Sequence, residues 1–454
     1  MPARLRHKLS GLLADQRFAE ILSGSIWTLA AKVVATLFAM LASIYVARVY
    51  GAGMTGILAL LNSFVVLVTI FTVLGTDTSV LRLIPEHIKK YSVISAFKAY
   101  RKTQYIVAAI SILTGGMAYL LADWIADVVL SKPQIGHYVA LAVCFVAARS
   151  LTDLNTSAVR GLRLNRVFAF MHVLPDMTKL IVLLVGSLFV ATQDVAVYAL
   201  LASWLIPALV GIVSMQVAFQ RRINSYDRRA TVEKLSVANI LAISLPMLMT
   251  TSMAFIIGRS GVIILGMYRP EQDVGYYAIA VTLATLTSFV LSAVNAMSAS
   301  KFSELYHSNQ MDELFYVAKK STKLIFWSTV PILFVLILFG KFAISFLYGP
   351  AFAVAYPALV LLTIGQFVNS ISGSNGMFMN MTGHQVALRN IMVLAALLNI
   401  GINLLLTPRY GAMGAAVAAM TSTIFWNIYV LVFIKRRYGQ TLGYVPGVRL
   451  SRRR

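Results

Sequence analysis

The sequence predicts an all-α integral membrane protein with about twelve transmembrane helices. Hydrophobic residues make up 59% of the 454 residues and charged residues only 12%, whereas roughly 25% of a soluble domain is charged. The mean hydropathy is +0.79. Apolar runs of about 20 residues, the length that crosses a bilayer core, recur along the chain. These runs are far longer than the roughly ten-residue strands of an outer-membrane barrel.

The apolar runs divide into six spans in each half of the chain. The predicted spans are 23–47, 55–75, 105–123, 137–158, 168–191 and 195–219, followed by 239–267, 275–298, 324–347, 355–381, 390–408 and 412–434. The predicted organisation is therefore a cytoplasmic amphipathic lead (1–22), an N-terminal six-helix bundle (23–219), a cytoplasmic linker (220–238), a C-terminal six-helix bundle (239–434) and a basic cytoplasmic tail (435–454).

The basic residues predict the orientation of these spans. Of the 39 Lys and Arg residues, 30 lie in the two terminal segments and the even-numbered connections. The opposite connections hold Lys132, Arg269 and Arg409, and Arg48 lies at the outer end of the first span. Because cytoplasmic loops carry the excess of Lys and Arg, both termini are expected to be cytoplasmic. The net charge of +23 therefore reflects topology and contact with anionic membrane lipids, and we expect no nucleic-acid partner.

Sequence similarity between the two halves indicates an internal repeat. YGAGMTGILALLNSFVVLV resembles YRPEQDVGYYAIAVTLATLTSFVL, with Gly56 opposite Gly275, and AVRGLRLNRVFAF resembles MNMTGHQVALRNI, with Gly161 opposite Gly383. Six spans per repeat is an even number, so the halves insert with the same orientation around an axis along the membrane normal. Repeats of this kind commonly enclose a substrate cavity between them.

Three segments carry a resemblance to a known family: VARVYGAGMTGILAL, KFSELYHSNQMDELFYVAKKSTKL and FLYGPAFAVAYPALVLL. They are similar to the polysaccharide-transporter branch of the multidrug/oligosaccharidyl-lipid/polysaccharide (MOP) exporters, which includes the Wzx-type flippases. The resemblance covers nearly the whole chain. It implies a V-shaped pair of six-helix bundles that moves an oligosaccharide linked to a polyprenyl diphosphate, such as undecaprenyl diphosphate, from the cytoplasmic to the periplasmic leaflet.

Cations inside the predicted spans are the candidate substrate-binding residues. Lys32 and Arg259 have no acidic neighbour at helical spacing, and an unpaired cation in a membrane usually faces a water-filled cavity or the bundle interior. Since spans 1 and 7 are equivalent in the repeat, both side chains are expected to face the seam and meet a diphosphate. The guanidinium of Arg259 can bind two phosphate oxygens at once. The alternative is an ion pair between Arg259 and Asp153 or Asp176 of another helix.

Two further cations and two carboxylates form local pairs. Arg149 precedes Asp153 by four residues and Asp176 precedes Lys179 by three, so each pair shares a helix face. Arg149 and Lys179 are candidates for the anionic cavity, and Asp153 and Asp176 for proton coupling; a purely structural ion pair is the alternative. Asn369, Asn375 and Asn380 give one span a polar stripe that suits either glycan hydroxyls or helix–helix hydrogen bonds.

Two rival functions are a drug or cation antiporter of the same superfamily and a membrane glycan polymerase or ligase. The excess of interior cations over acids favours an anionic substrate, and the short outer connections leave little room for a glycosyl-transfer site. The chain has no Walker A motif and one cysteine, Cys144, so we expect neither a cofactor nor a metal and no enzymatic activity. The expected location is the bacterial inner membrane, with the polysaccharide polymerase machinery as a candidate partner.

Overall fold

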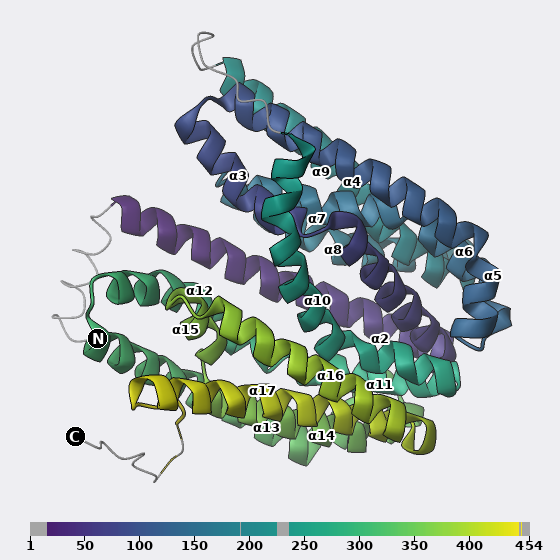
Figure 1. Ribbon diagram of the computed structural model, residues 1–454. Coiled ribbons are helices and arrows are strands. Elements are labelled where there is room, and N and C mark those ends of the chain that lie inside the picture. The colour runs from purple at the N-terminus through teal and green to yellow at the C-terminus, as the bar shows by residue number, and fades with distance from the viewer. Residues whose placement is uncertain (1–15, 191, 225–235, 445, 447–454) are drawn as a thin grey trace.

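The protein is a bundle of long helices. The computed structural model describes residues 16–190, 192–224, 236–444 and 446, and all regular structure within these ranges is helical (Figure 1). We call the first group of helices the N-half: α2 (Gln16–Val73), α3 (Thr76–Lys90), α4 (Val93–Leu120), α5 (Ala122–Trp124), α6 (Gly136–Cys144), α7 (Val146–Gly161), α8 (Asn165–Phe189) and α9 (Asp194–Asn224). A π-helix (Ile125–Val129) and a 3₁₀ turn (Pro133–Ile135) join α5 to α6.

The remaining helices form the C-half. They are α10 (Val237–Tyr268), α11 (Glu271–Thr285), α12 (Ser288–His307), α13 (Met311–Tyr348), α14 (Tyr356–Ser372), α15 (Asn375–Met381), α16 (Gln385–Tyr410) and α17 (Ala412–Tyr438). A 3₁₀ turn (Pro350–Ala355) precedes α14. The start of α2 and the end of α17 lie at the same end of the bundle, together with α3 and α12, whereas α5, α6 and α11 lie at the other (Figure 1). We call these the inner end and the outer end.

The prediction of an all-helical multi-pass membrane protein is confirmed, and the predicted apolar runs lie in helices. Within the described residues, eight helices are long and apolar enough to cross a membrane, or ten if the bent pairs α6–α7 and α11–α12 each count as one span. Two long helices explain the difference from twelve. Helix α2 has 58 residues, which is almost three bilayer thicknesses at about 1.5 Å per residue, and α10 contains a shorter apolar segment, Ser252–Tyr268.

Helix α2 holds two predicted spans because it bends at Gly51. This residue has φ 78° and ψ −175°, far from helical values, and a positive φ is strained for any residue with a Cβ. Downstream, the hydroxyl of Thr55 donates to the Gly51 carbonyl at 2.8 Å. One long helix therefore follows the bundle from the inner end and then changes direction near the outer end.

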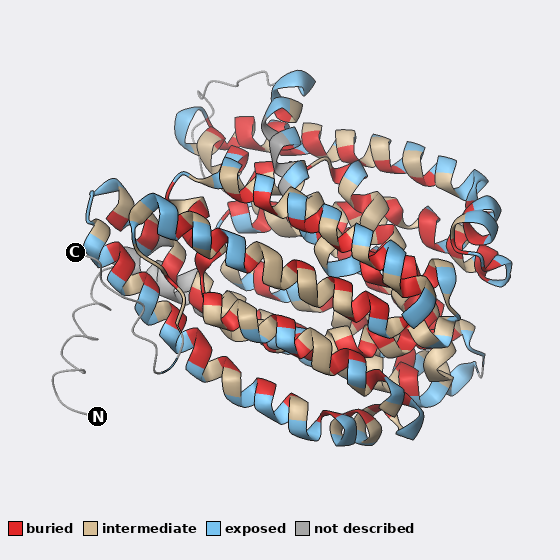
Figure 2. Cartoon of the chain, turned by 60° about the horizontal axis from the view of Figure 1, so that its bottom comes forward, coloured by how far each residue is buried: buried red, intermediate tan, exposed pale blue. Residues whose placement is uncertain are grey.

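Buried side chains lie between the helices, and exposed apolar side chains cover their outward faces (Figure 2). Leu120, Leu188, Phe189 and Phe342 are each more than two thirds exposed, which suits contact with lipid. One apolar core cluster crosses between the halves, because Ala47 and Leu60 of α2 pack with residues of α10 and α11. This cluster joins the halves next to the site described below.

The connection after the second predicted span begins with the amphipathic helix α3. Its buried residues include Val80, Leu83, Ile84 and His87, whereas Arg82, Lys89 and Lys90 are exposed. The carboxylate of Glu86 lies 2.6 Å from the Lys90 ammonium, and this hydrogen bond is the main reason that the pKa of Glu86 is lowered. The connection before α13 does not form a separate helix, because residues 311–348 are one continuous helix.

Candidate functional site: a cation-lined cavity between the halves

A cavity of about 240 Å³ lies on the seam between the N-half and the C-half. Helices α2, α7, α8 and α9 supply its N-half wall, and α10 and α11 supply the opposite wall. The α2 residues that line it lie on both sides of the bend at Gly51, from Ala39 to Asn62. The cavity is therefore built where the bent helix α2 meets the first two helices of the C-half.

Three of the four predicted cations line this cavity. Arg149 on α7, Lys179 on α8 and Arg259 on α10 all contribute to its wall, together with the carboxylate-bearing Asp176 on α8. The formal charge of these four lining residues is +2, because three are cationic and one is acidic. Since like charges in a confined space favour a counter-ion of opposite sign, the cavity suits an anionic group.

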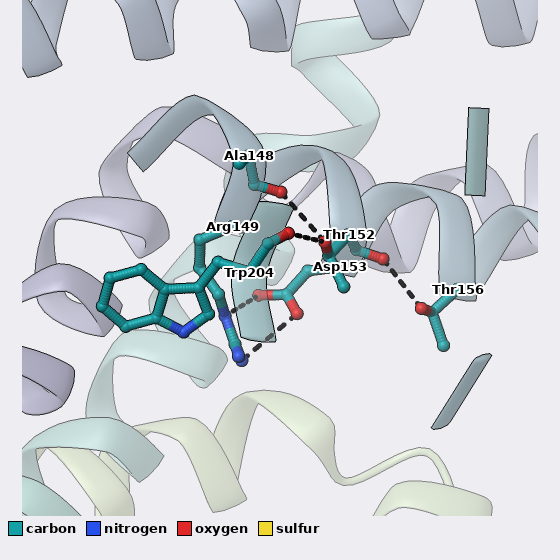
Figure 3. A network of polar contacts seen from close by, with 6 residues as sticks. All are labelled: Ala148, Arg149, Thr152, Asp153, Thr156 and Trp204. Atoms are coloured by element: carbon teal, nitrogen blue, oxygen red, sulfur yellow. Dashed lines mark hydrogen bonds and ion pairs between the residues drawn. The ribbon is translucent and has the colours of Figure 1, made fainter. Parts of the chain in front are cut away.

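Arg149 is held by an ion pair on its own helix. Its Nη2 lies 3.2 Å from Oδ1 of Asp153, and its Nε donates to Oδ2 at 3.3 Å. Figure 3 shows this two-point contact beside Thr152, whose hydroxyl lies 3.0 Å from the Ala148 carbonyl and 3.2 Å from the Trp204 carbonyl of α9. The ion pair keeps the Arg149 guanidinium in a fixed orientation, and the threonine ties α7 to α9.

Arg259 has neither an ion pair nor a hydrogen bond among the residues that the structure describes. Its side chain is exposed, although it lies on a helix between the two halves. The predicted alternative of an interhelical ion pair with Asp153 or Asp176 is thus not formed in this structure. Instead, Arg149 is close enough to repel it electrostatically. An unpaired cation at this depth usually faces a water-filled cavity or the bundle interior.

The residues beside Arg259 explain how α10 is held there. The hydroxyl of Ser260 donates to Oδ1 of Asn399 at 2.6 Å, so the helix is fixed to α16 one residue after the arginine. A Cβ at Gly261 would meet the Tyr277 hydroxyl at 2.7 Å, whereas a Cβ at Gly258 would meet no heavy atom within 4 Å. Gly261 therefore allows Tyr277 to pack closely against α10, whereas the space beside Gly258 is open.

Asp176 and Lys179 lie in the same wall without an ion pair closer than 4 Å in the described part of the chain. The sequence spacing predicted a direct pair. The charges still interact through space, since Asp176 attracts both Lys179 and Arg149. Pro175 lies inside α8 next to them and removes one backbone hydrogen-bond donor from the helix.

Lys32 faces the seam between the halves, as predicted, but it does not line the cavity that holds Arg259. Its ammonium donates to Ser292 of α12 at 2.7 Å and lies 5.5 Å from the centre of the Phe289 ring. The repeat places spans 1 and 7 in equivalent positions, but it does not fix how far along each span a side chain lies. Lys32 is nearer the inner end of α2 than the residues of α2 that line the cavity. Lys32 therefore joins the halves instead of lining the site.

None of the three asparagines proposed as glycan contacts lines the cavity. Asn375 is buried and donates to Oδ1 of Asn427 at 3.0 Å, and Asn369 donates to Gln366 at 3.2 Å. The backbone carbonyl of Asn380 accepts from Gln385 at 2.9 Å. These contacts stabilise the ends and packing of α14, α15 and α17, which is the structural alternative that the sequence had left open.

Other polar residues of the cavity carry no recognisable sequence signal. Ser43, Thr55, Asn62, Ser203 and Thr282 line the space between the cations. Single hydroxyl and amide side chains within apolar spans are common, and only the packing of α2, α9 and α11 shows which of them face the same space. They would be the hydrogen-bonding residues available to an uncharged part of a ligand.

Asp77 is a carboxylate near the site that the sequence reasoning missed. It is half-buried in the first turn of α3, two residues beyond the end predicted for the second span. Burial raises the pKa of the Asp77 carboxyl, and repulsion by Asp153 raises it further. Hydrogen bonds with Thr78 and with the backbone of Asp77 lower the pKa and offset this shift only in part. In the described ranges no group of three His, Cys, Asp or Glu side chains could hold a metal ion.

The fold is similar to that of several solved membrane transporters. The chain superposes on "Lipid II flippase MurJ, inward closed conformation" with a TM-score of 0.70 at 16% identity, covering 90% of this chain and 87% of that one. An inward-facing multidrug resistance MATE family transporter of the MOP superfamily gives 0.62 at 14% identity, covering 89% and 94%. A MOP superfamily transporter from Pyrococcus furiosus gives 0.59 at 14%, covering 92% and 95%.

A family model described as "Polysaccharide biosynthesis protein" matches residues 54–357, and the chain belongs to this family. This confirms the resemblance seen in the sequence. "Probable low-salt glycan biosynthesis flippase Agl15" of Haloferax volcanii is 27% identical over 188 residues, which cover 39% of each chain. "Uncharacterized membrane protein MJ1068" of Methanocaldococcus jannaschii is 22% identical over 36% of this chain. The alignments span only 32% and 39% of these two relatives.

Proposed function

We propose that the protein is a flippase that transfers a lipid-linked glycan, carried on a polyprenyl diphosphate, from the inner to the outer leaflet by alternating access. The observation that carries this proposal is the cation-lined cavity on the seam, with Arg259 free to bind an anion. The family and the glycan flippase named among its relatives support the same function. The glycan would be a repeat unit of O-antigen, exopolysaccharide or capsule, and the membrane the bacterial inner membrane.

The size of the cavity supports binding of one part of this substrate, the diphosphate. Pockets for drug-sized ligands measure roughly 300–1,000 Å³, and the cavity is smaller at about 240 Å³. A diphosphate group is compact and fits such a space, whereas an oligosaccharide needs the halves to move apart. Arg259 would bind the diphosphate with two parallel hydrogen bonds, and Arg149 and Lys179 would add charge from the opposite wall.

The first test is leaflet exchange of a polyprenyl-diphosphate oligosaccharide in liposomes that contain the purified protein. Arg259→Lys should keep part of the activity, because it retains the charge but loses the two-point geometry. Arg259→Ala should lower exchange by about tenfold or more, since a charge-assisted hydrogen bond contributes roughly 1.5–3 kcal/mol.

Lys341→Ala is the matched control, because this cation is exposed on α13 away from the cavity and should leave exchange unchanged. Equal exchange by wild type and both Arg259 variants would show that Arg259 is structural. Failure of the wild type to move the diphosphate lipid, together with transport of organic cations, would favour the drug antiporter instead.

A further inference from the structure

Two glycines that the repeat places opposite each other in the sequence meet at the outer seam. A Cβ on Gly56 of α2 would lie 1.8 Å from the backbone oxygen of Glu271, and a Cβ on Gly275 of α11 would lie 2.2 Å from that of Ala52. Neither distance is compatible with a side chain. The backbones of α2 and α11 therefore cross in direct contact, which only small residues permit.

A polar contact lies beside this crossing and joins the same two halves. The ammonium of Lys132, which is 5% exposed, donates to the Arg269 carbonyl at 2.6 Å and lies 4.0 Å from Oε1 of Glu271. The Gln134 side chain donates to the same Oε1 at 2.8 Å. Glu271 thus takes part in both contacts, with its backbone oxygen against Gly56 and its carboxylate against Lys132 and Gln134.

Arg48 adds a third link between the halves at the same end. Its Nε donates to the Leu347 carbonyl at 2.8 Å and its Nη2 to the carbonyl of Phe346, both at the end of α13. All three links lie on the outer side of the cavity.

We propose that the Gly56–Gly275 crossing and the Lys132–Gln134–Glu271 contact form an outer gate that must separate before the cavity opens outward. The gate proposal rests on the proposed flippase function in one respect, because the cavity must open outward for the lipid to be transferred. The physical design favours reversible opening. Lys132 and Glu271 lose their attraction when the gate separates but regain hydration, and these two terms largely offset each other for a buried ion pair. The glycine crossing contributes close packing without bulky interlocking side chains.

Accessibility of the cavity to a membrane-impermeant maleimide tests the gate without any substrate. Thr282→Cys, which lines the cavity, would be introduced into a Cys144→Ser chain, because Cys144 is a free and exposed thiol. Labelling from the outer side of right-side-out vesicles should be about fivefold or more faster in Gly56→Ala and in Lys132→Met than in the parent. Gly116→Ala is the control, since a Cβ there meets no heavy atom within 4 Å.

Lys132→Met keeps the test decisive if Gly56→Ala does not fold. Unchanged labelling from outside in a folded Lys132→Met protein and a folded Gly56→Ala protein would overturn the proposal. Faster labelling in Gly116→Ala as well would also overturn it, because the effect would then not belong to the seam.

A second measurement joins the gate covalently. Gln134→Cys and Glu271→Cys in the Cys144→Ser chain would be bridged with a short reducible bis-thiosulfonate. The bridged protein should show no outside labelling at a cavity cysteine and no lipid exchange, and reduction should restore both. Exchange at the full rate while bridged would overturn the gate. If the reduced protein labels normally but moves no glycan lipid, the flippase function fails and the gate stands.

Discussion

A single arginine poses the main energetic problem of this chain. A charged side chain at the centre of a bilayer costs from about 2.5 kcal/mol to more than 10 kcal/mol, depending on how far water and lipid adapt. Arg259 does not meet this cost with a carboxylate in the described structure, because Asp153 is bonded to Arg149 instead. Its exposure to the seam cavity keeps it hydrated, and a diphosphate would replace that water with stronger hydrogen bonds.

The chain of amides behind Arg259 gives a prediction about stability. Asn399 accepts from Ser260 and from Asn403, and donates to Ser422 at 2.9 Å. Asn399→Leu should lower the free energy of unfolding by about 1–2 kcal/mol, because it leaves its buried polar partners without a hydrogen bond. The expected loss is no larger because hydrogen bonds in membranes average less than 1 kcal/mol each. Thermal unfolding in detergent measures this. Asn390→Leu, exposed on the same helix, should change the midpoint little, and an equal loss in both would contradict the argument.

At the scale of elements, glycines decide where helices bend and end. Gly51 bends α2 near the outer end, and Gly373 ends α14 with φ 65°. These positions use a backbone conformation that other residues adopt only with strain. The bend at Gly51 allows one helix to line the cavity on both sides of the change in direction. The break at Gly373 separates α14 from α15 and leaves their asparagines for packing instead of ligand binding.

Gly373→Ala should therefore destabilise the C-half. The new Cβ would lie 2.2 Å from the Thr322 hydroxyl oxygen and would add the strain of a positive φ, so we expect a loss of about 1–3 kcal/mol. Gly401→Ala on α16 is the control, because a Cβ there meets no heavy atom within 4 Å and alanine favours the helix. The midpoint of thermal unfolding should fall clearly in Gly373→Ala and should stay the same or rise in Gly401→Ala. An equal fall in both variants would show that the break at Gly373 is unstrained.

At the scale of the whole molecule, the halves contact each other on both sides of the cavity. The glycine crossing and Glu271 join them on the outer side. Toward the inner end, Lys32 bonds Ser292, and the hydroxyls of Ser79 and Ser244 lie 2.8 Å apart between α3 and α10. The structure therefore represents a state in which the halves hold together on both sides of a small site. Transfer of a glycan would require one set of contacts to separate while the other holds.

The positive cavity also predicts how transfer is driven. A diphosphate lipid carries negative charge, and each elementary charge moved through 100 mV is worth about 2.3 kcal/mol. A potential that is negative on the inner side should accelerate outward exchange in proteoliposomes, and reversing its sign should slow it. Exchange measured under potassium diffusion potentials tests this. Exchange that ignores the potential but follows an imposed pH gradient would instead point to proton coupling through Asp153, Asp176 or Asp77.

The sequence by itself determined the class of fold and most of the charged residues of the site. Apolar runs and the position of Lys and Arg are sufficient for this, because a bilayer requires spans of a set length and penalises unpaired charge. Arg149, Lys179, Arg259 and Asp176 were all named from these two facts, and the structure brings them to one cavity. The pair Arg149–Asp153 follows from helical spacing alone.

Only the tertiary structure decided which residues share a space. Helical spacing does not say how far along a helix its neighbour crosses, so Lys32 was placed at the cavity although it bonds Ser292 on α12. For Asn369 and Asn375 the sequence left glycan contact and helix packing both open, and in the structure their side chains bond to other helix residues. The proposed outer gate could not be predicted from the sequence either. Gly56 and Gly275 match in the repeat, but only the structure shows that α2 and α11 cross in direct contact at these two glycines. Contacts between segments distant in sequence depend on packing, and packing is a property of the whole bundle.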